Sequence, residues 1–447
     1  MQTASSAAIK YPDTLDEDDN TPPPLSARGL FAAHSAFTTA SLPLSMFSRT
    51  ASAMLAQISK TSMIKAIPGA GTAMRINAAF LESVHMATKH YPEPPYGLDA
   101  TDITELSLPF AELRHFIPDS GTRGEPVLVV PAMANNYPSM MREVVRELLE
   151  RQHDVYIAHW KGAERVPLHK GFFSLDTYVE YLLHFLAHIG DRANIVAVCQ
   201  AGPASLAATA LTYQLGSQYP RPKTLAVIAS PMDTRVATSS MNKEARSRSV
   251  EWVDRHCLDT VPPPYPGTGR RVYSGIGQLL GLLRTGANVH KYRGQKMFDA
   301  IVDGNLDAAE DIKKFYEDNF NPRMSTDRPF ALQTFLRVFK EHHLPQKKWT
   351  WNDTIIDPAA IDDTALLAIE GLKDDICPLG QTLAMLAWCP RLDSSKKHHL
   401  SCDAGHYSVF AGKEWKTSGA PTVSAFIRQQ AGHAAKNIKP YPIAAPT

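Results

Sequence analysis

The chain has 447 residues, of which 44% are hydrophobic and 20% are charged, and its formal net charge at pH 7 is +1. This length is enough for one large domain with insertions or for two domains, and the composition is that of an ordinary globular protein. The near-zero charge provides no basic surface for nucleic acid or for an anionic membrane, so we expect neither partner.

The N-terminal region differs in composition from the rest of the chain. Residues 1–28 are polar and acidic and then proline-rich, which predicts a disordered tail without a secretory leader. Residues 29–95 carry apolar side chains in a helical pattern among small residues. We predict an N-terminal helical segment there, which either packs on the main domain or binds the surface of a lipid or polymer.

From residue 96 to residue 240, short apolar runs alternate with amphipathic helical patterns. Continuous apolar runs are typical of strands that are buried on both faces of a parallel sheet, and the alternation indicates an α/β fold. The expected strands cover residues 125–130, 154–158, 194–198 and 224–229, and the expected helices cover residues 138–151, 178–189 and 204–215. The sequence therefore predicts the first part of a mostly parallel, doubly wound core.

This alternation stops near Pro231. Residues 241–350 contain several helical patterns without buried strands, and we predict an inserted helical cap over the active site. The second part of the core occupies residues 351–447, with strands expected at 365–369 and near 398–400 and a closing helix near 423–430. No stretch reaches the roughly 18 uninterrupted apolar residues that span a bilayer, so we expect no transmembrane segment.

Cys199 directly follows the expected strand 194–198 and precedes a helix. A nucleophile on a sharp strand-to-helix turn is exposed at the top of the sheet, in the manner of the G-x-S-x-G motif. Here cysteine replaces serine, and Ala197 and Ala201 replace the two glycines. The helix N-terminus favours the thiolate, which is the reactive form of cysteine. We therefore predict that Cys199 is a catalytic nucleophile.

An acid and a histidine follow the nucleophile in the order that this fold uses. Asp374 lies on a loop directly after strand 365–369, and we prefer it to Asp375 because of the D-x-I-x-P pattern around it. His406 follows Gly405 in a loop before the last helix. We predict a Cys199, Asp374 and His406 triad, in which His398 and His399 are structural.

The same folding pattern suggests which groups surround the nucleophile. The backbone N–H of Gln200 is one expected donor of the oxyanion hole, and the N–H of Ala132 or Met133 is the expected second donor. We expect Asn135, Asn136 and Trp160 to contact the substrate, although asparagine also forms turns.

The five cysteines (Cys199, Cys257, Cys377, Cys389 and Cys402) are odd in number and widely spaced, with neither a CxxC pair nor zinc spacing. This usage fits a reducing compartment and predicts a cytoplasmic protein without a disulfide framework or a metal site.

With these motifs, the chain resembles the intracellular polyhydroxyalkanoate (poly-3-hydroxybutyrate) depolymerases from about residue 80 to residue 430. The stretches that carry the resemblance are Val196–Gln200, Pro231–Arg235, Gly269–Tyr273, Glu370–Cys377 and Lys397–Tyr407. The resemblance implies an α/β-hydrolase fold, a lid and a Cys-Asp-His triad at Cys199, Asp374 and His406. It also implies a polyhydroxyalkanoate polymer or its granule surface as partner, and no cofactor, although coenzyme A is conceivable as an acyl acceptor.

Two segments that flank the expected oxyanion hole depart from that family. Residues 131–137 read Pro-Ala-Met-Ala-Asn-Asn-Tyr and residues 201–204 read Ala-Gly-Pro-Ala. The Asn-Asn-Tyr run and the Trp160-Lys161-Gly162 stretch are closer to the related polyhydroxyalkanoate synthases, which we expect to carry a longer N-terminal region. The alternatives to a depolymerase are therefore a synthase-like acyltransferase and a granule-surface binding protein with a degenerate site. The sequence leaves the oligomeric state open.

Overall fold

The computed structural model describes residues 96–118, 121, 124–133, 138–275, 278 and 324–432, together with scattered positions between 29 and 78 and between 296 and 312. The predicted tail at 1–28, most of the predicted segment at 29–95 and much of the predicted cap lie outside these residues. In the part of the chain that is described, no helix has the length and apolar character needed to cross a membrane.

The described chain is built on one eight-stranded sheet with the strand order β1-β2-β4-β3-β5-β6-β12-β13. All neighbours from β4 to β13 pair in parallel, whereas β1 and β2 add an antiparallel edge. This is the strand order of the α/β-hydrolase fold, so the predicted fold class is confirmed. The strands are β1 Ala100–Ser107, β2 Ala111–Pro118, β3 Pro126–Val130, β4 Asp154–Trp160, β5 Asn194–Val198, β6 Thr224–Ile228, β12 Ala365–Gly371 and β13 Lys397–Cys402.

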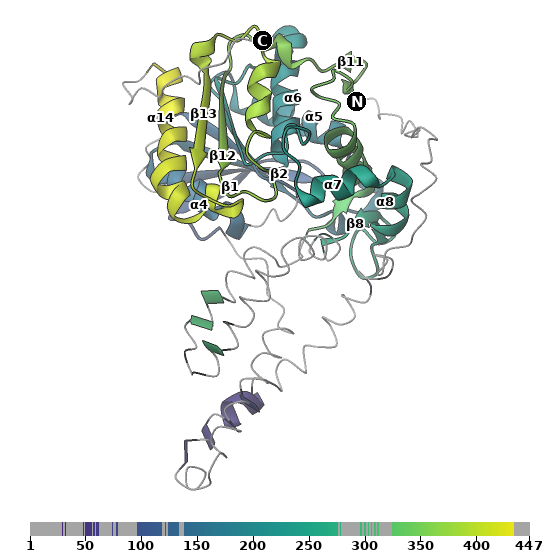
Figure 1. Cartoon of the computed structure of the whole chain (residues 1–447), viewed down its shortest axis with the longest axis vertical. Helices are drawn as coiled ribbons and strands as arrows, with labels where there is room; N and C mark the ends of the chain where they lie inside the picture. Colours follow the sequence, from purple (N-terminus) through teal and green to yellow (C-terminus); the bar gives the residue numbers. More distant parts are fainter. Residues whose placement is uncertain are drawn as a thin grey trace.

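Helices cover both faces of this sheet (Figure 1). Alternate residues of one strand face opposite sides, so Val127 and Val129 of β3 pack in one core cluster while Leu128 and Val130 pack in the other. Helices α4 Pro138–Glu150 and α14 Ala420–Gln430 cover the first cluster, and α5 Leu175–Ile189 and α6 Ala201–Gln214 cover the second. The apolar runs of the sequence are thus strands buried on both faces, as their composition predicts.

Residues 241–350, predicted to form a helical cap, contain short strands as well as helices. Strands β7 Asp259–Thr260, β8 Arg271–Tyr273 and β9 Thr326–Asp327 form a small antiparallel sheet. Two- and three-residue strands are too short to produce a periodic pattern, which explains why the sequence does not reveal them. The helices of this region are α7 Ser240–Ser247, α8 Val250–His256 and α12 Arg328–Thr334, which continues as η4 Phe335–Lys340.

Short elements complete the connections. They are η1 Ala163–Arg165, η2 Leu168–Lys170, η3 Gly216–Gln218, the hairpin β10 Thr350–Trp351 and β11 Thr354–Ile355, η5 Pro358–Ala360, η6 Leu383–Trp388, η7 Ser394–Lys396, η8 Tyr407–Val409, α13 Gly412–Glu414 and η9 Trp415–Gly419.

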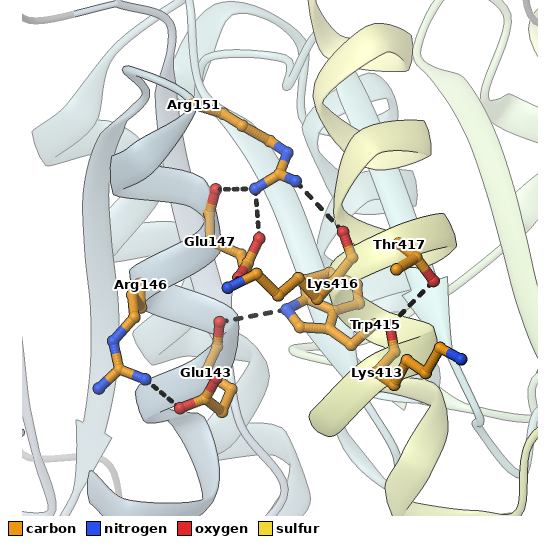
Figure 2. Close-up of polar contacts among 8 residues, drawn as sticks. All are labelled: Glu143, Arg146, Glu147, Arg151, Lys413, Trp415, Lys416 and Thr417. Atoms are coloured by element: carbon orange, nitrogen blue, oxygen red, sulfur yellow. Dashed lines mark hydrogen bonds and ion pairs between the residues drawn. The ribbon is translucent and has the colours of Figure 1, made fainter.

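The C-terminal segment that follows β13 is attached to α4 by buried polar contacts (Figure 2). The indole N–H of Trp415, a side chain that is completely buried, donates to the carbonyl of Glu143 at 3.1 Å. The carboxylate of Glu147 is buried between Arg151, its ion-pair partner, and Lys416, whose Nζ lies 3.7 Å away. These contacts anchor the chain a few residues beyond the loop that carries His406.

A buried ion pair joins the short cap sheet to the core. The Arg270 guanidinium lies 2.7 Å from the Asp327 carboxylate, and the two side chains are 0% and 1% exposed. Arg270 also donates to the carbonyl of Val166, and Asp327 accepts the N–H of Phe173 at 2.8 Å. Since Val166 and Phe173 both lie between β4 and α5, this ion pair fastens the cap sheet beside the core.

Replacing Asp327 with alanine is expected to lower the free energy of unfolding by about 3–5 kcal/mol, because Arg270 would remain buried without its counter-ion. Urea denaturation would measure this change. Asp362→Ala removes the partner of Arg391 in an exposed pair and is the matched control, with an expected loss below about 1 kcal/mol. Equal losses of unfolding free energy in the two variants would contradict a stabilising role of the buried Arg270–Asp327 pair.

Candidate active site

Cys199 occupies the turn between β5 and α6 with a backbone φ of +56°. This left-handed conformation is unfavourable for a residue with a β-carbon, and residues held in it cluster at functional sites. The N–H of Cys199 donates to the carbonyl of Ile228 at 2.8 Å, and its carbonyl accepts the N–H of Gly202 at 3.2 Å. The half-buried thiol therefore stands at the carboxyl end of the sheet on a strained, tethered turn.

Small residues allow this turn to form. Ala197 and Ala201 are both buried, as the sequence pattern predicts. The tightest position, however, is Gly202, where a β-carbon would lie 2.1 Å from the hydroxyl of Ser230 and 2.7 Å from a methyl group of Val227. Only glycine at this position lets the first turn of α6 approach β6 so closely.

Two loops from distant parts of the chain bring the expected acid and base together. Asp374 lies just after β12, His406 lies after β13, and their Oδ2 and Nδ1 atoms are 2.8 Å apart. Both side chains are almost completely buried, whereas Asp375 is exposed. The structure thus brings Asp374, and not its neighbour, to the imidazole.

Buried groups hold the loop of Asp374 at both ends. At one end, the N–H of Lys373 donates to the carbonyl of Ala404 at 3.0 Å, which joins this loop to the loop of His406. At the other end, the fully buried carboxylate of Glu370 accepts the N–H groups of Gly380 and Thr382, each at 2.8 Å. Such charge-assisted bonds to backbone N–H groups are among the stronger hydrogen bonds in proteins.

Cys377 and His406 are the side chains that lower the pKa of the Cys199 thiol. The hydrogen bond from Cys377 and the positive charge of His406 hold the pKa of Cys199 well below its ordinary range, although burial opposes this shift. Burial alone would lower the pKa of His406, but the Cys199 charge and the hydrogen bond with Asp374 raise it to about 10. Both shifts favour a thiolate beside an imidazolium.

The expected donors of an oxyanion hole lie next to this sulfur in the chain or at the end of the adjacent strand. Gln200 directly follows Cys199, and its backbone N–H contributes to lowering the pKa of the Cys199 thiol. Ala132 and Met133 follow β3 directly and are buried, and no described residue accepts a hydrogen bond from either N–H. All three N–H groups are thus candidates to bind a developing oxyanion.

The residues expected to touch the substrate are placed differently. Asn135 and Asn136 lie outside the described residues. Trp160 is only 2% exposed, stacks on Tyr178 with ring centroids 4.2 Å apart, and donates its indole N–H to the carbonyl of Pro131 at 3.0 Å. Its side chain is therefore part of the core behind the loop at 131–133, because its polar atom is already used there.

Two residues near the nucleophile are not identified by the sequence analysis, Tyr178 and Cys377. The hydroxyl of Tyr178 donates to the same Pro131 carbonyl at 3.1 Å. Tyr178 lies within an amphipathic helix, where nothing in the pattern separates it from other core residues. Cys377 offers one signal, since it lies three residues after Asp374 in the same loop.

Part of the chain matches a known protein family. Residues 229–431, slightly less than half of the chain, match the family described as PHB de-polymerase C-terminus. The matched range contains Asp374 and His406 but begins after Cys199.

A curated protein is also similar in sequence, the poly(3-hydroxyalkanoate) polymerase subunit PhaC of Haloarcula marismortui. It is 35% identical over 106 residues, which are 21% of this chain and 22% of that protein, so the match spans about a fifth of the polymerase subunit. Together with the family match, this relates the chain to proteins of polyhydroxyalkanoate metabolism without separating depolymerases from polymerases.

Solved structures to which the chain is similar include the alpha/beta hydrolase GrgF from Penicillium sp. sh18 and an alpha/beta hydrolase fold protein from Nakamurella multipartita. The first is 14% identical with a TM-score of 0.43, covering 75% of this chain and 100% of that one. The second is 13% identical with a TM-score of 0.42, covering 74% of this chain and 100% of that one.

The charge state of Cys199 predicts unusual reactivity. The rate of alkylation by iodoacetamide should be nearly constant between about pH 6 and pH 8. The rate for a free thiol with a pKa of about 8.5 instead falls roughly tenfold for each pH unit that the pH is lowered over this range. His406→Gln removes the neighbouring cation and should restore the steep dependence. Mass spectrometry of the Cys199 peptide measures the alkylation rate of the wild type and of His406→Gln at each pH, with glutathione as reference. A wild-type profile parallel to that of glutathione would contradict the ion pair.

Proposed function

We propose that this chain is a polyhydroxyalkanoate depolymerase that cleaves ester bonds of poly-3-hydroxybutyrate through an acyl-enzyme on Cys199. The observation that carries the proposal is the arrangement of a thiolate on a strained turn beside an imidazole that is bonded to a buried carboxylate. The match to the depolymerase family over the part of the chain that contains Asp374 and His406 supports the choice of substrate.

In the acylation step the Cys199 thiolate attacks the ester carbonyl and forms a C–S bond. The negative oxygen of the tetrahedral intermediate is held by the N–H of Gln200 and by an N–H from Ala132 or Met133. When the ester C–O bond breaks, the imidazolium of His406 gives its proton to the departing alkoxide oxygen. Asp374 orients the imidazole and stabilises its positive charge, as in other triads.

In the deacylation step His406 takes a proton from water, and the resulting hydroxide attacks the thioester carbonyl. The C–S bond breaks, the electron pair returns to Cys199, and 3-hydroxybutyrate or an oligomer leaves as the acid. The thiol of coenzyme A could replace water as the acyl acceptor, which would release a thioester. Neither route requires a metal or a bound cofactor.

Exposed apolar side chains beside the acid loop support a polymeric substrate of low polarity. Leu372 and Leu379 lie on this loop and are 54% and 46% exposed. Val236 is 58% exposed and packs beside Gly380, the next residue of the loop. Exposed apolar side chains are common at binding surfaces, and these three would face the polymer or its granule.

The second candidate function is that of a polyhydroxyalkanoate synthase, which the sequence identity with the haloarchaeal polymerase subunit favours. A synthase would form the same acyl-enzyme but pass the acyl group to the hydroxyl end of a growing chain. The arrangement of the triad serves both reactions, since they differ only in the acyl acceptor.

Exposure to amorphous poly-3-hydroxybutyrate should add a 3-hydroxybutyryl or oligomeric acyl group to Cys199, and free 3-hydroxybutyrate or oligomers should appear in solution. Cys199→Ala and His406→Gln are each expected to lower the rate by about 10³-fold or more, because the triad acts as a unit. Mass spectrometry of the Cys199 peptide and chromatography of the products measure these changes. His184→Gln, which changes an exposed histidine, is the control and should retain full activity.

The products distinguish the candidate functions. Polymer growth from 3-hydroxybutyryl-coenzyme A without release of 3-hydroxybutyrate from polymer would assign the chain to the synthases. Binding to granules by the wild type and by Cys199→Ala alike, without either activity, would show a granule-binding protein with an inactive site.

Trp160 and Tyr178 both donate to the Pro131 carbonyl. We therefore expect Tyr178 to orient the oxyanion loop, residues 131–133, which carries the proposed donors Ala132 and Met133. Burial raises the pKa of Tyr178 well above its usual value, so its hydroxyl remains a donor. Tyr178→Phe is expected to lower kcat by about tenfold with little change in KM, less than the 10²- to 10³-fold loss for an oxyanion donor itself.

Steady-state kinetics on a soluble 3-hydroxybutyrate oligomer measures this effect. Tyr213→Phe removes another tyrosine hydroxyl, which is bonded to Thr364 at 2.8 Å just before β12, and is the matched control. Equal kcat values for Tyr178→Phe and the wild type would exclude the orienting role.

A further inference from the structure

A single hydroxyl group joins the loop of the proposed acid to the strand end beside the nucleophile. Thr382 lies directly before η6 and is completely buried. Its Oγ1 atom accepts the N–H of Ser230 at 2.8 Å and donates to the carbonyl of the same residue at 3.0 Å. The two residues are 152 positions apart in the chain, so this hydroxyl links two separate segments of the core.

Ser230 belongs to the segment that holds the Cys199 turn. Strand β6 ends at Ile228, whose carbonyl accepts the N–H of Cys199 at 2.8 Å. Ala229 then turns the chain with a φ of +48°, and the hydroxyl of Ser230 lies against the first turn of α6 at Gly202. A shift of Ser230 would therefore disturb the restraints on the nucleophile.

The backbone of Thr382 belongs to the acid loop, residues 372–382, which carries Asp374 between β12 and η6. The N–H of Thr382 donates at 2.8 Å to the buried carboxylate of Glu370, which also accepts the N–H of Gly380. Glu370 lies just before the loop and Thr382 at its end, so these bonds close the loop around Asp374. The Thr382 hydroxyl then fastens the closed loop to the end of β6.

This hydroxyl is not used by the helical turn that Thr382 precedes. A threonine directly before a helix commonly accepts a hydrogen bond from an N–H of the first turn. The side chain of Thr382 makes no such bond with η6, and both of its hydrogen bonds go to Ser230. The hydroxyl therefore serves the contact between two segments and not the local secondary structure.

We propose that Thr382 is a positioning residue, whose hydroxyl sets the acid loop at a fixed distance from the Cys199 turn. It acts through Asp374, which in turn holds the imidazole of His406. The proposal rests on the proposed function only in taking Cys199 and His406 as the reacting pair. Such positioning matters because a misplacement of reacting groups by about 1 Å can lower a rate by about 100-fold.

Thr382→Val removes the hydroxyl and keeps the branched shape of the side chain, whereas Thr382→Ser keeps the hydroxyl. Thr364→Val is the matched control, because the Thr364 hydroxyl is also buried and donates to the carbonyl of Pro222 at 2.7 Å. That contact lies just before the starts of β12 and β6, at the opposite end of the same two strands.

Two measurements are made on each variant. The rate at which iodoacetamide alkylates Cys199 at about pH 6.5, where an ordinary thiol is almost fully protonated, is followed by mass spectrometry of the Cys199 peptide. Urea denaturation gives the free energy of unfolding, so that an effect on the site is separated from an effect on the fold.

Thr382→Val is expected to slow alkylation of Cys199 by about fivefold or more, a factor comparable to the loss of one ordinary hydrogen bond. The physical reason is that a displaced acid loop would move the positive charge of His406 away from the sulfur. Thr382→Ser should restore the wild-type rate. Thr364→Val should keep the wild-type rate, although it should lose unfolding free energy to a similar extent as Thr382→Val.

If Thr382→Val does not fold, Thr382→Ala carries the comparison. A wild-type alkylation rate in the folded variant that lacks the hydroxyl would overturn the proposal. Equal slowing in Thr382→Ser or in Thr364→Val would overturn it as well, because the effect would then not depend on this hydroxyl.

Alkylation needs no polymer, so this test is independent of the substrate. Slow alkylation of Thr382→Val, in a chain whose wild type neither degrades nor builds polymer, would support the positioning role and reject the proposed function. Polymer degradation by the wild type, with alkylation of Thr382→Val at the wild-type rate, would do the reverse.

Discussion

The backbone conformation of Cys199 is the constraint on which the rest of the site depends. A residue with a β-carbon held in the left-handed region costs about 1–3 kcal/mol, and it persists only where its surroundings determine it. Here the N–H of Cys199 is bound to β6 and its carbonyl to the first turn of α6. The close approach of α6 at Gly202 completes the restraint. The position of one sulfur thus depends on the packing of a helix against the centre of the sheet.

A second constraint comes from the burial of the Asp374 carboxylate. The carboxylate of Asp374 is shielded from solvent and accepts two backbone N–H groups and the imidazole of His406. Such bonds replace the water that an exposed carboxylate would hold, and they fix the orientation of the carboxylate. The loop around Asp374 is therefore shaped by the need to satisfy this charge. Its anchorage on Glu370 and on the loop of His406 keeps acid and base in register.

Much of this architecture could be predicted from the sequence, because its signals are local. Most of the buried strands appear as continuous apolar runs. Cys199 and Asp374 each follow such a run, and His406 follows the more polar strand β13, in the order that the fold requires. The structure brings Asp374 to His406 across the gap between two loops.

The features that escaped prediction arise from contacts between distant segments. The strands of the small cap sheet are two or three residues long and are defined by their pairing with one another, so they leave no periodic pattern in the sequence. The sequence suggests Trp160 as a substrate contact, but its side chain is buried and its indole N–H is bonded to the carbonyl of Pro131, just after β3. The contact of Tyr178 with the Pro131 carbonyl likewise joins residues that lie far apart in the chain.

The Pro131 carbonyl fixes the orientation of residues 131–133, the loop that carries the proposed oxyanion donors Ala132 and Met133. It accepts hydrogen bonds from both Trp160 and Tyr178, two nearly fully buried donors. A rotation of the peptide plane between Pro131 and Ala132 would strand both donors without water, at a cost of about 1–3 kcal/mol each. At about 1.4 kcal/mol per factor of ten, the rotated conformer would be at least about 30-fold less populated. Under the proposed function, nearly all molecules without substrate would then already have the Ala132 N–H in its final orientation, and very few would have to rotate this peptide before the first turnover.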